Sequence, residues 1–299
     1  MSGCSVAAHC SPLTAHSSLP LSIYDSRFTI HVLKARIGTS GFGIGQAKYA
    51  QLFSCVEVQH TFYQPPSSAT LERWRHAAPS DFEFVLKAWQ LITHDAKSPT
   101  YRRLKKKLSE VEKQEAGYFR PTAIVKEAWE VTLACAHALK ARTILFQCPA
   151  SFKQTKENIS NLKEFFSSIN RENTDENSDG RSINRKNSKG GGLNLCWEPR
   201  GDWDPKVVKS ICDELNLWHV VDPFVSRSVT PNKIYYRLHG RQGWRYEYDD
   251  AELRELAAML AGSRAKRNIP GKGKAPYIFF NNVRMIQDAS RFKAILEET

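Results

Sequence analysis

The chain of 299 residues contains no run of 18 or more apolar residues, so the sequence predicts no membrane-spanning helix. Its seven cysteines are scattered and odd in number, and no Cys-x-x-Cys pair or other zinc-ligand spacing occurs. These absences argue against a disulfide framework and a zinc module, and they favour free thiols in a reducing compartment. We therefore expect a cytoplasmic globular protein.

Several sequence signatures of catalysis are also missing. No Gly-x-Gly-x-x-Gly or Gly-x-x-x-x-Gly-Lys-Ser/Thr loop is present, which weakens an open nucleotide-binding sheet. No Gly-x-Ser-x-Gly elbow indicates a serine nucleophile, and no cysteine stands in an evident Cys–His setting. The metal-binding spacings His-x-His and His-Glu-x-x-His are absent as well. Candidate residues must therefore be found from their places in the fold.

Two segments depart from a globular composition. Residues 1–34 are rich in Ser, Ala and His and lack the basic start and apolar core of a signal peptide. We expect a disordered leader, or a start codon assigned too far upstream; a transit peptide is the weaker alternative because no Arg precedes Arg27. Residues 170–192 are rich in Asn, Ser, Arg and Gly, which predicts a disordered low-complexity insertion. The chain from 35 to 299 is then one domain that also carries a long charged loop, Ser98–Arg120.

Eight short apolar, β-branched or aromatic runs predict strands. They are Ala35–Thr39, Val56–Phe62, Phe82–Ala88, Thr143–Cys148, Leu193–Glu198, Leu217–Asp222, Lys233–His239 and Tyr277–Asn281. Helical patterns lie between most of them, at Ala47–Phe53, Ser68–Ala77, Pro121–Leu139, Lys156–Ile169, Pro205–Leu215, Asp249–Leu260 and Ile286–Leu296. Alternating strands and helices predict a parallel α/β sheet, and eight repeats favour a closed TIM (β/α)8 barrel over an open doubly wound sheet.

Polar and charged side chains stand toward the C-terminal ends of the predicted strands. A charge in a buried barrel strand is costly unless it is paired or used, and active sites of barrels lie at this end. The two-residue spacing of Glu198 and Arg200, and of Arg237 and His239, places each pair on one face, where pointing inward is cheaper. The candidate catalytic residues are Glu57, Lys87, Glu198, Asp222 and His239. The candidate substrate-binding residues are Ser40, Gln147, Arg200, Arg237 and Asn281.

This mixture of acids and bases predicts an enzyme, hydrolase-like or lyase-like, that acts on a small anionic or phosphorylated substrate. The carboxylates and His239 would transfer protons, while Lys87 and the arginines would hold a carboxylate or phosphate. Three alternatives stay open. The ring could be a buried salt-bridge network that fixes strand register, or the barrel could bind a ligand without catalysis. Glu57, Glu198, Asp222 and His239 also form an oxygen-rich set that could hold a divalent metal.

The net charge of +12 is concentrated in two stretches. Residues 97–113 carry seven Lys and Arg against two Glu, and residues 262–274 carry five Lys and Arg with no acid. Such blocks indicate a polyanionic partner, and the alternative function is therefore binding or processing of nucleic acid through these two loops. Two solvated loops that keep the protein soluble are the other interpretation.

A series of short motifs resembles domain-of-unknown-function family 72, also called YecE-like, from about Arg36 to the C-terminus. The motifs are Ile37–Phe42, Val56–Val58, Thr61–Tyr63, Phe84–Ala88, Leu91–His94, Phe146–Pro149, Trp197–Arg200, Val221–Asp222, Tyr236–Gly240 and Phe279–Asn282. The Ser98–Arg103 segment looks especially like the archaeal branch. The resemblance implies a TIM barrel without an established activity. The family's barrel is similar to metal-dependent barrels such as endonuclease IV and xylose isomerase, which suggests nucleic-acid chemistry, but this sequence lacks their His-rich ligand set. His60 stands where many relatives have Asn or Ser, which makes it a poor catalytic candidate.

Overall fold

The computed structural model describes residues 35–172, 192–265 and 275–298. The expected leader at 1–34 and the expected insertion from residue 173 to 191 lie outside this part of the chain. The insertion was predicted to begin at Asn170, but Asn170 and the two residues after it continue the helix α8 (Lys156–Glu172).

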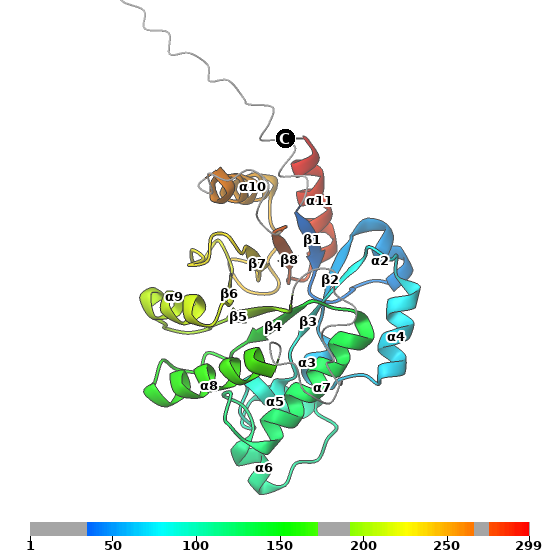
Figure 1. The fold of residues 1–299 in the computed structure, drawn as a ribbon. Coiled ribbons are helices and arrows are strands. Elements are labelled where there is room, and N and C mark those ends of the chain that lie inside the picture. Colours follow the sequence, from blue (N-terminus) through cyan, green and yellow to red (C-terminus); the bar gives the residue numbers. More distant parts are fainter. Residues whose placement is uncertain (1–34, 173–191, 266–274, 299) are drawn as a thin grey trace, which may run out of the picture.

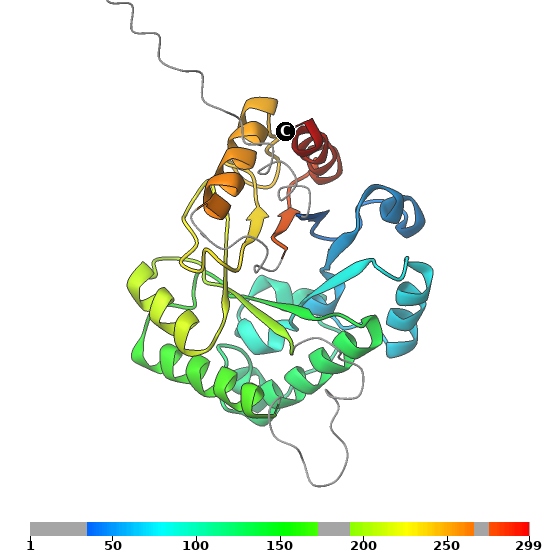
Figure 2. The same cartoon turned by 45° about the horizontal axis from the view of Figure 1, so that its top comes forward.

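Eight parallel strands form one sheet in the order β1-β8-β7-β6-β5-β4-β3-β2, so all eight predicted strands are confirmed. Their bounds are β1 (Arg36–Thr39), β2 (Cys55–Val58), β3 (Glu83–Lys87), β4 (Thr143–Gln147), β5 (Asn194–Glu198), β6 (Trp218–Val221), β7 (Tyr235–Leu238) and β8 (Tyr277–Phe280). The sheet curls into a nearly closed barrel with helices on its outside (Figures 1 and 2). The predicted TIM-barrel fold is confirmed.

Apart from the shorter helical segments described below, seven helices follow strands in the described residues. Each of the seven lies where the sequence predicts a helix. They are α2 (Gln46–Leu52), α4 (Ser68–Ala77), α7 (Ala123–Leu139), α8, α9 (Pro205–Glu214), α10 (Asp250–Ala265) and α11 (Met285–Glu298). The expectation of eight strand–helix repeats is wrong at one place, because residues 222–234 between β6 and β7 contain no helix. Pro223 and Pro231 disfavour a helix there, and the backbone of Val229 instead donates to Nδ1 of His219 at 3.1 Å.

The second predicted strand is too long. β2 ends at Val58, and a helical turn, α3 (His60–Tyr63), follows at once. The hydroxyl of Thr61 donates to the carbonyl of Val58 at 3.1 Å and to that of Lys87 at 2.7 Å, which fixes the turn against the end of β3. Phe62 thereby lies over the site described below instead of extending the sheet.

The charged loop after β3 is also structured. It holds a 3-10 helix, η1 (Pro99–Arg103), and the short helix α6 (Glu110–Glu115), and it follows a turn of helix, α5 (Gln90–Thr93). Ser109 and Glu112 form a complete capping box at the start of α6. The loop is therefore folded onto the barrel on the same side as α3.

Strands β1 and β2 close the barrel without a regular ladder. In the described residues, one isolated bridge joins them, between Ser40 and Glu57. The phenol of Tyr49 replaces the missing backbone bonds, since it accepts from the amide of Thr39 at 2.9 Å and donates to the carbonyl of Cys55 at 3.0 Å. The phenol of Tyr49 and the backbone bond from the amide of Gly41 to the carbonyl of Glu57, at 2.8 Å, thus both hold the seam.

Gly38 permits the close approach of the two strands at this seam. A Cβ atom at this position would lie 2.3 Å from the carbonyl oxygen of Cys55, closer than any side chain tolerates. The glycine is therefore required by packing of β1 against β2.

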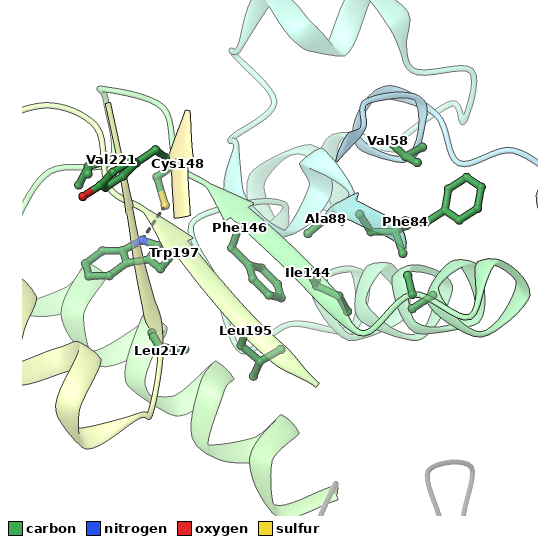
Figure 3. Packing of buried hydrophobic residues seen from close by; sticks show 14 of the residues in the cluster. Val58, Phe84, Ala88, Ile144, Phe146, Cys148, Leu195, Trp197, Leu217 and Val221 are labelled. Atoms are coloured by element: carbon green, nitrogen blue, oxygen red, sulfur yellow. Dashed lines mark hydrogen bonds between the residues drawn. The ribbon is translucent and has the colours of Figure 1, made fainter. Parts of the chain in front are cut away.

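Most of the apolar core lies between the sheet and the helices. Outward-facing side chains of β4 and β5, among them Ile144, Phe146 and Trp197, are fully buried there (Figure 3). The indole nitrogen of Trp197 donates to Sγ of Cys148 at 3.3 Å. Cys148 and the four other described cysteines are buried, and none of them is in a disulfide.

The amino end of the barrel carries one charged pair that the sequence pattern did not predict. Arg36 pairs with Glu83 at 2.8 Å, and the phenol of Tyr277 donates to the same carboxylate at 2.8 Å. Charges in the strands are therefore not confined to the carboxyl ends.

Candidate active site at the carboxyl mouth of the barrel

The alternation of side chains along the strands gathers the ten predicted residues at one end of the barrel. A cluster of inward-facing apolar residues fills the middle of the barrel. The residue two positions later on each strand also points inward, one layer nearer the carboxyl end. The pairs are Cys55 and Glu57, Val85 and Lys87, Leu145 and Gln147, Cys196 and Glu198, Val220 and Asp222, Tyr235 and Arg237, and Phe279 and Asn281. With Ser40, Arg200 and His239, these polar residues form what we call the mouth ring.

Arg237 is the centre of the mouth ring and is fully buried. Its Nε and Nη2 donate to the two carboxylate oxygens of Glu57 at 2.9 and 2.8 Å, a bidentate pair. Its Nη1 donates to Oε2 of Glu198 at 2.5 Å and to Oε1 of Gln147 at 2.9 Å. Protein groups therefore occupy all sides of this guanidinium, and it has no donor directed at a ligand.

Glu57 is the deepest carboxylate and accepts from several elements. Besides Arg237, the hydroxyl of Ser40 donates to it at 3.0 Å, the phenol of Tyr235 at 2.6 Å, and the amide of Gln59 also does. Burial raises the pKa of Glu57, but the charge and hydrogen bonds of Arg237 outweigh this and hold that pKa below its ordinary value. Glu57 is therefore an ionised, fully occupied carboxylate.

Glu198 connects this inner pair to the groups that face solvent. Its Oε1 accepts from Nε of Arg200 at 3.0 Å and lies 3.1 Å from Nε2 of His239. Burial raises the pKa of Glu198, but the charges of Arg237 and Arg200 hold that pKa well below its ordinary value. Glu198 thus orients two side chains at the surface of the site.

The outer part of the mouth ring is half-buried. The side chain of Arg200 is 39% exposed and that of His239 is 24% exposed, whereas Glu198 is 7% exposed. Nη2 of Arg200 lies 2.9 Å from Nε2 of His239, and Nδ2 of Asn281 lies 3.1 Å from Nδ1 of the same imidazole. These exposed donors are the first groups that a molecule entering the mouth would meet.

Lys87 differs from every other charged member of the mouth ring. It is only 5% exposed, and in the part of the chain that the structure describes its amine has no hydrogen bond or ion pair. The Nζ atom lies 3.8 Å from the ring centroid of Phe62. Burial, together with the charge of Arg237, lowers the pKa of Lys87 to about 7. The amine is therefore free to act on a bound molecule.

Asp222 belongs to the ring but is turned to the backbone. Its Oδ2 accepts from the amide of His239 at 2.9 Å and its Oδ1 from the amide of Phe224 at 3.1 Å. Burial raises its pKa. The carboxylate positions the end of β7, where His239 begins the next loop.

Three residues that sequence reasoning did not select contribute to the site: Tyr235, Phe62 and His94. His94 is buried, and its ring packs against Phe62 with centroids 4.9 Å apart. Burial and the charge of Lys87 lower the pKa of His94 to about 3, so the imidazole is neutral. Tyr235 could have been found from its even spacing before Arg237 on an inward face, and Phe62 and His94 from their places in the motifs Thr61–Tyr63 and Leu91–His94 of the family resemblance.

The oxygen-rich metal set does not fit the geometry. In the described ranges, no three His, Cys, Asp or Glu side chains come close enough together to hold a metal ion. Glu57 and Glu198 are both neutralised by Arg237, and the oxygens of Asp222 are taken by backbone amides. We therefore derive no chemical step through a metal.

A separate cavity of about 260 Å³ lies near the amino ends of β1, β2 and β3. Its lining includes Ile37, Phe53, Phe82 and Leu296, and no residue of the mouth ring. It is therefore distinct from the mouth ring. Among the described residues, no helix is long and apolar enough to cross a bilayer.

The fold and site define a class: a TIM-barrel protein with a charged site at the carboxyl ends of its strands. The chain belongs to the family described as "Protein of unknown function DUF72", whose model matches residues 46–299. The UPF0759 protein YunF of Bacillus subtilis (strain 168) is 23% identical over 284 residues, covering 83% of this chain and 84% of that protein. The family resemblance seen in the sequence is thus confirmed, and the archaeal branch stays a prediction.

Solved structures of the same family share the fold. A DUF72 family protein from Enterococcus faecalis V583 has a TM-score of 0.62 at 19% identity and covers 89% of this chain and 96% of its own. One from Thermotoga maritima MSB8 has a TM-score of 0.58 at 20% identity and covers 87% and 98%. The barrel is thus the fold of the family.

Proposed function

We propose that this protein is an enzyme that binds a small anionic or phosphorylated molecule at the mouth ring and acts on it by lyase-like or hydrolase-like chemistry. The observation that carries the proposal is Lys87 itself: the residue is only 5% exposed, and its amine has no hydrogen-bond or ion-pair partner in the described residues. A salt-bridge network that only fixed strand register would pair this amine, because an unpaired buried charge is costly.

The pairing of charges in the ring favours an anion beside Lys87. Glu57 and Glu198 pair with Arg237 and Arg200, and Asp222 is directed to backbone amides. With Asp222 ionised and Lys87 protonated, the formal charges of these Asp, Glu, Lys and Arg side chains sum to zero, but the Lys87 cation has no carboxylate partner in the described residues. A bound carboxylate or phosphate would supply the missing partner.

We assign the ten candidates to three roles. Lys87 acts on the substrate as base or nucleophile, while Arg200, His239, Gln147 and Asn281 present polar atoms to it. The others are positioning residues: Arg237, Glu57, Glu198, Ser40 and Asp222. In this assignment Arg237 does not bind substrate, because its donors are already used.

The test is a screen of the purified protein against phosphorylated metabolites and small carboxylates, with turnover followed by NMR. Lys87→Met is expected to reduce turnover of any substrate found by on the order of 10²–10⁴. Lys209→Met, which changes an exposed lysine of α9, is the matched control and should leave turnover unchanged. Wild-type turnover that survives Lys87→Met would contradict the proposal, and binding without product would indicate a ligand-binding barrel.

Nucleic-acid binding is the second candidate, and one observation favours it. In the described residues Lys97, Arg102, Lys105 and Lys107 are exposed and make no ion pair. The loop that carries them is anchored beside the mouth, since the phenol of Tyr101 donates to the carbonyl of His94 at 2.7 Å. The side chains of the second basic stretch, at 263–274, lie outside the described residues.

Salt dependence tests this candidate. For a protein that neutralises DNA phosphates, the logarithm of the binding constant falls linearly with the logarithm of the salt concentration. On duplex DNA the magnitude of this slope is about 0.9 per phosphate contact. Changing Lys97, Arg102, Lys105 and Lys107 together to Gln should lower the magnitude of that slope by about 3.6 if each contacts one phosphate. Anisotropy of a labelled duplex measures it, and no binding at low salt would remove the candidate.

A further inference from the structure

The surroundings of Lys87 explain why its amine remains without a partner. The nearest carboxylates, Glu57 and Glu198, are each held by Arg237, and Glu198 also accepts from Arg200. On the other side the amine faces the ring of Phe62 at 3.8 Å, an aromatic surface that offers no oxygen. Both carboxylates are thus already paired with arginines, and the amine of Lys87 has no protein partner in the described residues.

The amine is also held in place. Lys87 is the last residue of β3, and its own carbonyl accepts from the hydroxyl of Thr61 at 2.7 Å. Phe62 is fixed from behind by His94, whose Nδ1 lies 2.8 Å from the hydroxyl of Thr93. A fixed, desolvated amine at the end of a barrel strand has the properties of a covalent nucleophile, not of a mobile surface charge.

We propose that Lys87 forms a Schiff base with a carbonyl compound that also carries a carboxylate or phosphate. This inference rests on the proposed function and names its substrate class. The exposed guanidinium of Arg200 is the group that would hold the anionic end.

The step balances without a further reagent. The lone pair of neutral Nζ forms a bond to the carbonyl carbon, the C=O π pair moves to the oxygen, and this oxygen takes one proton from Nζ to give a carbinolamine. The C–O bond then breaks, and the oxygen leaves as water with the second Nζ proton. One amine and one carbonyl give one neutral imine and one water, with no electrons exchanged. After the imine takes a proton from solvent, it can accept the electron pair released when a neighbouring C–C or C–H bond breaks, which is lyase-like chemistry.

The charges around Lys87 set the pH range of this reaction. Arg237 from β7 and Arg200 from the loop after β5 oppose its protonation, while Glu57 from β2 and Glu198 from β5 favour it. His94 from the loop after α5 is neutral. Since burial lowers the pKa of Lys87 to about 7, its free-amine fraction at pH 7 exceeds that of an ordinary lysine on the order of a thousandfold. The adduct should therefore form at neutral pH and decline below pH 6.

The experiment traps the imine by reduction. The full-length protein is incubated with glyoxylate, an aldehyde with a carboxylate, and with acetaldehyde, which has none, each with sodium cyanoborohydride at pH 7. Peptide mass spectrometry then gives the modified fraction of each lysine. We expect Lys87 to react with glyoxylate at least about tenfold faster than the exposed Lys97 and Lys209, because more of its amine is neutral.

Two variants separate the parts of the inference. Lys87→Arg keeps the charge and should remove the adduct without loss of folding. Arg200→Met should abolish the preference for glyoxylate over acetaldehyde while Lys87 still reacts. Modification of Lys87 no faster than the exposed lysines would overturn the inference.

A parallel measurement keeps failure of the inference apart from failure of the proposed function. Thermal stabilisation by inorganic phosphate, which has no carbonyl group, reports anion binding without imine formation. Binding that persists in wild type without an adduct overturns the Schiff base and leaves the anion site. Absence of both overturns the two together.

Discussion

Replacing Arg237 with Met tests whether the mouth ring is held together by one buried guanidinium. The change removes the hydrogen-bonded partner of Glu57 and of Glu198, which are 0% and 7% exposed at the side chain. Breaking a buried pair in this way leaves an uncompensated charge and typically costs about 3–5 kcal/mol. We expect a loss of that size in the free energy of unfolding at pH 8, measured by urea denaturation.

An exposed pair supplies the matched control. Arg254 lies 3.5 Å from Glu298, and the two side chains are 60% and 63% exposed. Pairs of this kind contribute at most about 1 kcal/mol, so Arg254→Met should change stability little. Both variants exchange one arginine for the same apolar residue. The difference between their losses in the free energy of unfolding therefore measures the effect of burial on the ion pair.

The pH dependence of the stability difference between Arg237→Met and wild type is a second, independent test. In wild type the pKa values of Glu57 and Glu198 lie below their ordinary values, so their stabilising contribution is present above pH 4.5 and is lost only at lower pH. Without Arg237, burial raises both pKa values, and the variant gains stability by binding protons as pH falls from 8 to 5. The difference in the free energy of unfolding between variant and wild type should therefore become smaller toward pH 5. A loss below about 1 kcal/mol, or a difference independent of pH, would refute this account of the ring.

Three further outcomes follow from the seam and the mouth. Tyr49→Phe removes the phenol that bridges to the carbonyl of Cys55, and should lower the free energy of unfolding by about 1–3 kcal/mol in urea denaturation. Gly38→Ala should lower the thermal midpoint sharply because its Cβ would lie 2.3 Å from a carbonyl oxygen, whereas Gly262→Ala on α10 meets nothing within 4 Å and should be neutral or stabilising by up to about 1 kcal/mol. Arg200→Met should abolish calorimetric binding of inorganic phosphate with little change in stability, because its side chain is 39% exposed. An unchanged free energy of unfolding in Tyr49→Phe would contradict the role of the phenol at the seam. An unchanged thermal midpoint in Gly38→Ala would contradict the close approach of the strands, and phosphate binding by Arg200→Met would contradict the role of Arg200.

Strand periodicity was enough to predict the barrel and the membership of the ring. A polar residue two positions after a buried inward residue, as in Val85 and Lys87, must point inward at the carboxyl end once the strands are parallel. The ends of elements were less predictable. The sequence predicts one strand over Val56–Phe62, but β2 ends at Val58. The hydrogen bond from Thr61 to the carbonyl of Lys87 fixes the turn that follows, and this contact cannot be predicted from the local sequence.

Roles within the ring depend on distances that no spacing gives. Arg237 was predicted to bind substrate, yet it reaches two carboxylates from strands far apart in the chain. Asp222 was predicted to be catalytic, yet the loop after β6 directs it to backbone amides. Lys87 has no hydrogen-bond partner in the described residues, since Glu57 and Glu198 are paired with arginines instead. The lack of a partner for the Lys87 amine is therefore a property of the folded barrel.

The most direct test of the account is the titration of the Lys87 amine itself. Lysine labelled with ¹³C at Cε and ¹⁵N at Nζ can be followed by NMR from pH 5 to 11, and Lys87→Arg identifies the resonance. We expect a midpoint of about 7 for Lys87, compared with the ordinary lysine pKa of about 10.4 in model peptides. A Lys87 midpoint at or above that ordinary value would mean that the amine is a paired or solvated ammonium, and it would contradict the proposed site.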